Sequence, residues 1–152
     1  MKPPPRILLV EDDPRDAELT LNVLASADPA PEVIHLYDGA EALDFLYRRG
    51  AFAARETGPP SVMLLDLKMP RIDGMEVLRQ VKSDPLLKTI PIVVLTSSRE
   101  ERDVRETYAL GANAYVVKPV RFHNFLEAIK AVGVFWTDLN EPPPAGGPGA
   151  SG

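Results

Sequence analysis

Four short apolar runs that end in polar residues constrain this chain more than any other feature of its sequence. Residues 7–10, 61–65, 91–95 and 114–117 form these runs. The residues that follow them are, in order, Glu11 and Asp12; Asp66; Thr96 and Ser97; Lys118 and Pro119. Short continuous apolar runs are typical of strands buried on both faces of a parallel sheet, and ligands bind beyond the carboxyl ends of such strands. The sequence therefore predicts one polar site assembled from distant segments.

Length and composition favour one ordinary globular domain. The chain has 152 residues, of which 45% are hydrophobic and 26% charged, and its net charge of -5 argues against a general nucleic-acid binder. The absence of cysteine excludes disulfides, thiol catalysis and thiolate metal sites, and fits a reducing compartment. No apolar run approaches the roughly 20 residues of a membrane span, and the first residues lack the apolar stretch of a secretory signal. We expect a cytoplasmic protein.

Helical patterns alternate with the apolar runs, and a fifth strand is expected over residues 33–37, at a sheet edge because it is the least uniformly apolar. The residues expected to cap helices are Asp13, Asp38, Asp73 and a capping box over residues 98–101. The inner face of the second helix is expected to be Ala42, Leu43, Leu46 and Tyr47, and residues 122–132 have the spacing of a fifth helix. This alternation predicts an α/β fold with helices on both faces of a parallel sheet.

The chain ends differ from this pattern. Residues 1–5 form a short tail, residues 6–133 the folded domain, residues 134–140 an aromatic arm, and residues 141–152 a Pro-, Gly- and Ala-rich tail expected to be disordered. Phe135 and Trp136 either fold back onto their own core or pack on a partner, and the second alternative is slightly favoured.

The residues at the strand ends suggest metal-dependent phosphate chemistry. Glu11, Asp12 and Asp66 would repel one another in a partly desolvated site, and a hard cation such as Mg²⁺ would relieve that repulsion. Asp66 is the natural nucleophile, because carboxylates form acyl phosphates. The Thr96 hydroxyl and the Lys118 ammonium are suitable partners for phosphoryl oxygens. Asp13 is interpreted as a helix cap rather than a metal ligand.

Several motifs together resemble the receiver domain of response regulators. They are residues 7–12, 65–70, 73–74, 95–97, 111–112 and 115–119, in that family's order and spacing from about residue 6 to residue 132. The resemblance implies a flavodoxin-like, doubly wound sheet of five parallel strands in the order 2-1-3-4-5, with five helices and, here, a C-terminal arm. Glu11 departs from the family pattern, in which Asp is commonest at this position.

The resemblance also implies roles for individual residues. Asp66 would accept a phosphoryl group from a sensor histidine kinase in the presence of Mg²⁺, for which Mn²⁺ or Ca²⁺ could substitute. The implied metal ligands are Asp12, Asp66, the backbone carbonyl of Lys68 and, through water, Glu11. The implied phosphate-binding residues are Thr96, Ser97 and Lys118. Thr96 and Tyr115 would form a switch pair, and the Lys118–Pro119 peptide bond would be cis.

A finer resemblance concerns the segments around the core motifs. Residues 43–50, the pair Pro59 and Pro60, and residues 135–143 are similar to stand-alone receivers paired with phytochrome-type kinases. This resemblance implies a homodimer formed through the fourth helix, the strand at 114–117, the fifth helix, and the arm with Phe135 and Trp136. Nucleic-acid binding is not expected, because no helix-turn-helix segment follows Val132 and no basic stripe is visible.

The leading hypothesis is a single-domain response regulator: a phospho-accepting signalling protein, not an enzyme, that takes part in its own phosphorylation and dephosphorylation. One alternative is a non-phosphorylated scaffold with the receiver fold. A less favoured alternative is an aspartyl-phosphate phosphohydrolase, which would need an acid where this chain has Lys68. His35 and His123 are expected to be surface residues away from the site.

Overall fold

Five parallel strands form a single sheet in the order β2-β1-β3-β4-β5, which confirms the predicted topology. The structure, a computed structural model, describes residues 6–26, 30–55, 58–119, 121, 123, 124 and 127. The strands are β1 (Arg6–Val10), β2 (Glu32–Leu36), β3 (Val62–Asp66), β4 (Ile92–Thr96) and β5 (Ala114–Val117). Within this described part, β2 pairs with β1 alone, so the strand predicted to lie at an edge does so.

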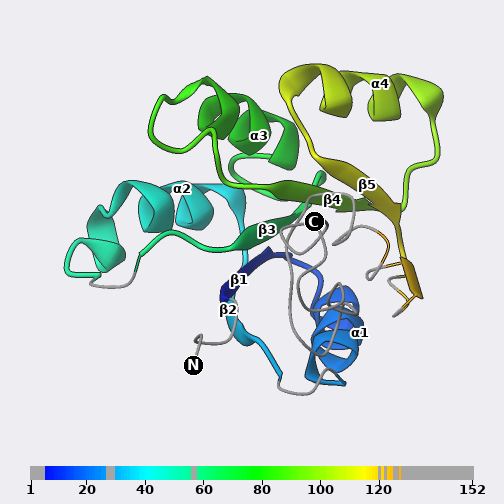
Figure 1. Cartoon of the computed structure of the whole chain (residues 1–152), viewed down its shortest axis with the longest axis horizontal. Coiled ribbons are helices and arrows are strands. Elements are labelled where there is room, and N and C mark those ends of the chain that lie inside the picture. Colours follow the sequence, from blue (N-terminus) through cyan, green and yellow to red (C-terminus); the bar gives the residue numbers. More distant parts are fainter. Residues whose placement is uncertain are drawn as a thin grey trace, which may run out of the picture.

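The helices cover both faces of the sheet. They are α1 (Pro14–Ala25), α2 (Gly39–Tyr47), α3 (Gly74–Ser83) and α4 (Glu101–Leu110), with a 3₁₀ turn, η1, at Gly50–Phe52. Figure 1 shows α1 on one face of the sheet and α2, α3 and α4 on the other. Almost all of the predicted fifth helix at residues 122–132, the arm at 134–140 and the tail at 141–152 lie outside the described residues.

Alternate residues of the central strands supply two separate apolar cores. Leu8 and Val10 of β1 contribute to the core beneath α2 and α3, whereas Ile7 and Leu9 contribute to the core on the α1 side. All four side chains are fully buried. Burial on both faces explains why the strands appear in the sequence as continuous apolar runs rather than as alternating patterns.

The three predicted aspartate caps are confirmed. Asp13 Oδ1 accepts hydrogen bonds from the backbone N–H groups of Arg15 and Asp16, at 2.8 and 3.1 Å, and Pro14 occupies the first position of α1. Asp38 Oδ1 accepts from Glu41 N at 2.8 Å, and Asp73 Oδ1 from Glu76 N at 3.0 Å. Each cap satisfies a backbone donor that the first turn leaves free.

Two local predictions are wrong. The capping box over residues 98–101 does not form, because α4 begins at Glu101 and its cap position is Glu100, which makes no side-chain cap hydrogen bond. Ser98 instead accepts a hydrogen bond from Glu100 N and donates one to Asp103. On α2, Tyr47 is 36% exposed, whereas Phe45 is buried. Phe45 is covered by an edge-on contact with Phe52 of η1, a contact that helical periodicity alone does not reveal.

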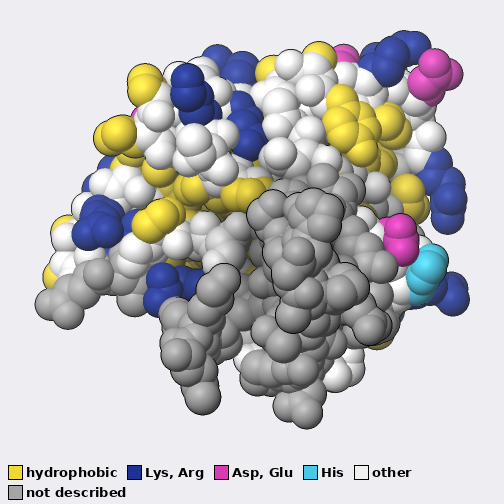
Figure 2. Space-filling view, in the orientation of Figure 1, with side chains coloured by type: hydrophobic (Ala, Val, Ile, Leu, Met, Phe, Trp, Pro, Cys, Tyr) yellow, Lys and Arg dark blue, Asp and Glu magenta, His cyan; other side chains and the backbone are white. Residues whose placement is uncertain are grey.

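Basic side chains do not gather in one place on the described surface that Figure 2 shows. On the face drawn in Figure 2, Lys and Arg side chains are scattered over α2, α3 and α4 rather than joined in one stripe. None of the helices in the described ranges is both long enough and apolar enough to cross a bilayer.

Gly74 fixes how closely α3 approaches the end of β3. A Cβ atom at this position would lie 2.1 Å from the Asp66 carbonyl oxygen and 2.7 Å from Leu67 Cα. Both atoms belong to the backbone, so they cannot move aside as a flexible side chain could. The Gly74 N–H also donates to the Leu67 carbonyl at 2.7 Å, so the close approach is part of the turn itself.

We therefore expect Gly74→Ala to lower the free energy of unfolding by about 2–3 kcal/mol, measured by urea denaturation, because the added methyl overpacks a rigid turn. Gly58→Ala is the matched control, since no atom lies within 4 Å of its added Cβ. Equal unfolding midpoints for the two variants would contradict this account of the turn.

Candidate functional site

The carboxyl ends of β1 and β3 bring three carboxylates together, as predicted. Glu11 and Asp12 directly follow β1, and Asp66 is the last residue of the neighbouring strand β3. One carboxylate oxygen from each of the three residues lies within 4.8 Å of the others. Glu11 is fully buried, Asp66 is 5% exposed, and Asp12 is half-buried. Three acidic groups this close and this buried need a cation to offset their charge.

Lys118 supplies a cation at the centre of the cluster. Its ammonium nitrogen Nζ lies 2.5 Å from Glu11 Oε1, 3.3 Å from Asp66 Oδ1 and 3.0 Å from Asp16 Oδ2. The side chain is only 11% exposed. The backbone N–H of Lys118 donates to the Thr96 carbonyl at 2.8 Å, which ties the start of the loop after β5 to the end of β4. The Lys118–Pro119 peptide bond is cis, which confirms that prediction.

Burial and charge shift the protonation of this cluster. Desolvation of the Asp66 carboxyl, reinforced by the nearby charge of Glu11, raises the pKa of Asp66 to about 7, although Lys118 acts in the opposite direction. Burial alone would lower the pKa of Lys118, but its contacts with Glu11, Asp66 and Asp16 outweigh burial and raise it. The site therefore holds a charged ammonium beside a carboxyl that titrates close to neutral pH.

The residues present fit a hard divalent cation. Glu11 Oε2 accepts a hydrogen bond from Asp13 N at 3.1 Å, whereas Oε1 is a buried oxygen that, within the described residues, accepts from no neutral donor. Its close contact is the ion pair with Lys118. A fully buried carboxylate oxygen that already contacts a cationic group, beside two further carboxylates, is suited to an oxygen-binding cation. Asp13 is a cap, as predicted, and is not part of the three-carboxylate cluster.

Ser98 connects the two residues predicted to form a switch. Thr96, the last residue of β4, is 2% exposed, and its Oγ1 accepts a hydrogen bond from Ser98 N at 3.2 Å. The Tyr115 hydroxyl donates to the Ser98 carbonyl at 3.0 Å. Ser98 Oγ in turn donates to Asp103 Oδ2 of α4 at 2.6 Å. One residue therefore joins the end of β4, β5 and α4.

The remaining predicted residues lie as follows. Ser97 and Lys68 have exposed side chains next to the ends of β4 and β3. Phe135 and Trp136 lie outside the described residues.

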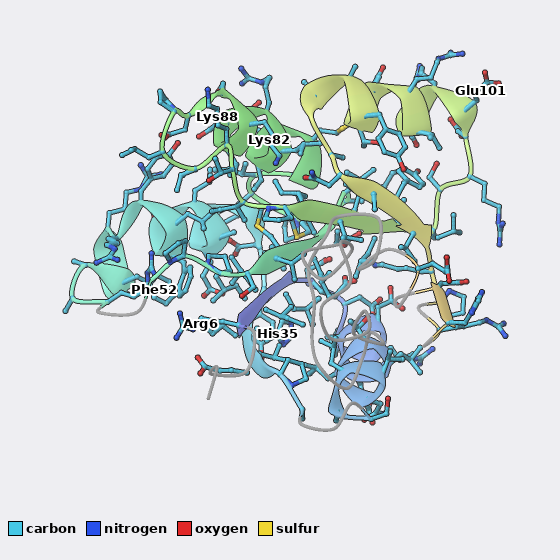
Figure 3. The ribbon with its side chains drawn as sticks, viewed as in Figure 1. Arg6, His35, Phe52, Lys82, Lys88 and Glu101 are labelled. Atoms are coloured by element: carbon cyan, nitrogen blue, oxygen red, sulfur yellow. The ribbon has the colours of Figure 1, made fainter. Side chains whose placement is uncertain are left out.

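His35 is closer to the site than expected. Its Nε2 lies 2.9 Å from the backbone carbonyl oxygen of Glu11, and a hydrogen bond there requires Nε2 to carry the proton. The ring is half-buried and packs on Tyr37 with 4.2 Å between ring centroids. Figure 3 shows His35 on β2. The prediction that His35 lies away from the site is therefore wrong, whereas His123 is exposed as expected.

Two contacts of the site were not predicted from the sequence. Asp16 binds Lys118, and Ser98 bridges Thr96 and Tyr115. Asp16 lies in the first turn of α1, three residues after its cap, where an acidic residue is also expected for reasons of helix stability alone. No sequence signal separates these two roles.

The raised pKa of Asp66 has a consequence for stability. A carboxyl whose pKa is higher in the folded protein binds its proton more tightly there than in the unfolded chain, so stability falls as the pH rises toward the folded pKa. The shift from 3.8 to about 7 corresponds to about 4 kcal/mol at 1.36 kcal/mol per unit. We expect the free energy of unfolding of Asp66→Asn, measured by urea denaturation in EDTA, to exceed that of the wild type by about this amount at pH 8. We expect this difference to shrink toward pH 4.

Asp13→Asn provides the control for this prediction. Asn caps helices as well as Asp does, and Asp13 is exposed, so the same change of charge should leave stability nearly unchanged. If the difference in free energy of unfolding between Asp66→Asn and the wild type is the same at pH 4 and pH 8, the destabilisation does not come from ionised Asp66.

Comparisons with known proteins agree with this geometry. Residues 7–130 match the family described as "Response regulator receiver domain". Response regulator Rcp1 of Synechocystis sp. is 40% identical over 144 residues, which cover 94% of this chain and 96% of Rcp1. The crystal structure of the Mn²⁺-bound form of Rcp1 superposes with a TM-score of 0.74, covering 92% of this chain and 99% of that one.

Two further structures are similar over most of their length. Bacteriophytochrome response regulator RtBRR is 58% identical, with a TM-score of 0.81, and the match covers 93% of this chain and 85% of that one. The phosphorylated cyanobacterial phytochrome response regulator RcpA is 37% identical, with a TM-score of 0.75, and the match covers 90% and 96%. With an acidic cluster, a buried lysine and the 2-1-3-4-5 sheet in place, this chain belongs to the response-regulator receiver family.

Proposed function

We propose that this protein accepts a phosphoryl group on Asp66 from a phosphohistidine of a sensor histidine kinase. Response regulators with receiver domains are signalling proteins, and we assign this chain the role of phospho-acceptor rather than enzyme. One observation carries the proposal. Asp66 ends β3 almost fully buried, with its Oδ1 3.3 Å from the Lys118 ammonium and the Glu11 and Asp12 carboxylates beside it.

The transfer needs a nucleophile and a means of neutralising charge. An Asp66 carboxylate oxygen forms the new bond to phosphorus while the bond from phosphorus to the histidine nitrogen breaks, and that nitrogen keeps the bonding electron pair. Lys118 places a positive charge beside Asp66, where the phosphoryl oxygens arrive. The Thr96 hydroxyl, at the end of the next strand, and the Ser97 hydroxyl would donate to the same oxygens.

We assign Mg²⁺ as the metal, with Mn²⁺ or Ca²⁺ able to substitute. Asp12 and Asp66 would bind it through their side chains, Lys68 through its backbone carbonyl, and Glu11 through water. Bound Mg²⁺ supplies positive charge to the transferred phosphoryl group. The cluster of three carboxylates, in which Glu11 Oε1 already contacts the Lys118 ammonium, supports this assignment, as does the Mn²⁺-bound form of the relative Rcp1.

Phosphorylation would be transmitted through Ser98. A phosphoryl group adds about -1.5 to -2 charges at the strand ends and would draw the Thr96 hydroxyl toward it. That movement breaks or weakens the hydrogen bond from Ser98 N, and Ser98 also holds Tyr115 and Asp103. The loop between β4 and α4 is therefore the element that would switch conformation or partner binding.

We propose a phytochrome-type kinase as the partner, in a bacteriophytochrome light-signalling system. Support comes from the 58% identity to the bacteriophytochrome response regulator RtBRR and from the similarity to RcpA.

We place the protein in the cytoplasm, as its family suggests. The net charge of -5 and the scattered Lys and Arg side chains of Figure 2 support a protein partner rather than nucleic acid or a membrane surface.

Phosphorylation is tested by intact-mass spectrometry after incubation with acetyl phosphate and Mg²⁺. We expect the wild type to gain one phosphoryl group, and we expect Asp66→Asn and an EDTA-treated sample to gain none. Asp13→Asn should be phosphorylated like the wild type, since Asp13 caps α1. Absence of an adduct on folded wild-type protein would favour the scaffold alternative.

We further propose a homodimer formed through α4, β5, the predicted fifth helix and the arm at residues 134–140. Aromatic residues are enriched at such interfaces.

Replacing Phe135 and Trp136 together by Ser is expected to lower the molar mass measured by light scattering from dimer to monomer, or to weaken dimerisation at least tenfold. Leu86→Ser, which changes an 87% exposed side chain elsewhere, is the control. If the wild type is monomeric both before and after phosphorylation, this dimer is excluded.

A further inference from the structure

We propose that Asp16 is a positioning residue for Lys118, holding its ammonium in place when Glu11 and Asp66 turn to a bound cation. Asp16 Oδ2 accepts a hydrogen bond from Lys118 Nζ at 3.0 Å. The two residues are 102 positions apart in sequence, so the contact depends on the fold. The consequence for phosphorylation rests on the proposed function, whereas the consequence for metal binding does not.

Asp16 is fixed by the start of α1. Its backbone N–H donates to the Asp13 cap at 3.1 Å, and the next N–H, that of Ala17, donates to the Asp13 carbonyl at 2.9 Å. The first turn is therefore secured at Asp13, directly after the two acidic residues that follow β1. This arrangement lets a helix residue reach the same lysine that Glu11 contacts from the strand end.

The ammonium of Lys118 has three hydrogens, and three carboxylates surround it. Two of the three, Glu11 and Asp66, also belong to the cluster able to hold a metal ion, whereas Asp16 does not. A cation that enters the cluster competes with Lys118 for Glu11 and Asp66. Asp16 is the carboxylate that can keep its contact with Lys118 throughout this exchange.

Burial distinguishes this contact from an ordinary surface ion pair. The Lys118 side chain is 11% exposed and that of Asp16 is 35% exposed, whereas Arg105 and Glu101 on α4 pair with exposures of 68% and 83%. A mostly buried ammonium that loses one carboxylate cannot recover the interaction from water. Without Asp16, Lys118 would pair more closely with Glu11 and Asp66 and would oppose the entry of a cation.

The test compares two variants that lose the same charge at neighbouring positions. Asp16→Asn loses the carboxylate that holds Lys118, and Asp13→Asn loses one that only caps α1 and is replaced by an equally good cap. Mg²⁺ binding to the full chain is measured by titration calorimetry. We expect Asp16→Asn to weaken Mg²⁺ binding about fivefold, and Asp13→Asn less than twofold, because only the first change frees Lys118.

A double-mutant cycle separates positioning from a purely structural role. In a Lys118→Met background, Asp16→Asn and Asp13→Asn should weaken Mg²⁺ binding to the same extent, since no lysine remains to be held. Equal effects of the two variants in the wild-type background would overturn the proposal. A larger effect of Asp16→Asn that persists without Lys118 would overturn it as well.

Asp16→Glu keeps the test decisive if the Lys118 variant does not fold. Glutamate preserves the charge and has the length to reach Lys118, so we expect Mg²⁺ affinity within about twofold of the wild type. Binding as weak as that of Asp16→Asn would overturn the proposal.

The last measurement is the rate of phosphorylation by acetyl phosphate at saturating Mg²⁺. Here Asp16→Asn should form the adduct about three- to fivefold more slowly than Asp13→Asn, because Lys118 is less well placed for the phosphoryl oxygens. A wild type that binds Mg²⁺ but takes no phosphoryl group would refute the proposed function, and the calorimetric comparison would still decide the role of Asp16. Equal adduct rates for the two variants would limit Asp16 to metal binding and overturn its role in transfer.

Discussion

The interaction on which the site depends is the contact between the Lys118 ammonium and the buried carboxylates of Glu11 and Asp66. A fully buried Glu11 and an Asp66 that is 5% exposed would be costly without a cation nearby. Lys118 offsets that cost, yet the pKa of Asp66 is still raised to about 7, so the compensation is incomplete. A site left with residual negative charge remains attractive to a divalent cation, while its lysine keeps the carboxylates together in the absence of that cation.

Strand order explains why these groups meet. β1 and β3 are neighbours, so Glu11 and Asp66 emerge side by side, and β4 and β5 follow on the same edge with Thr96 and Lys118. All five strands are parallel, so every carboxyl end lies at that edge. Gly74 adds a further constraint, because α3 begins against the backbone of Asp66 and Leu67 at a distance that admits no Cβ atom. The position of Asp66 is thus determined from both the sheet and the following helix.

The features predictable from the sequence are those that local chemistry determines. Strands buried on both faces appear as apolar runs, and the caps at Asp13, Asp38 and Asp73 each bind N–H groups two or three residues away. The features that were missed depend on tertiary distance or on where an element begins. Asp16 and Lys118 are 102 residues apart, and His35 reaches the Glu11 carbonyl from the adjacent strand. Ser98 fits a capping box in the sequence, but α4 begins later, which frees its hydroxyl for Asp103.

The two sides of the site are held by different kinds of contact, at Ser98 in the loop before α4 and at Asp16 on α1. On the β4 side, Ser98 is held by polar contacts to Thr96, Tyr115 and Asp103, and such contacts can exchange partners. On the α1 side, Asp16 belongs to a capped helix whose buried face packs through Leu24 on the sheet. A change of charge at Asp66 would therefore act on Lys118 between the Asp16 contact on α1 and the polar contacts of the loop before α4. The rearrangement that we propose would therefore run toward α4, where polar contacts hold the loop, rather than toward the capped helix α1.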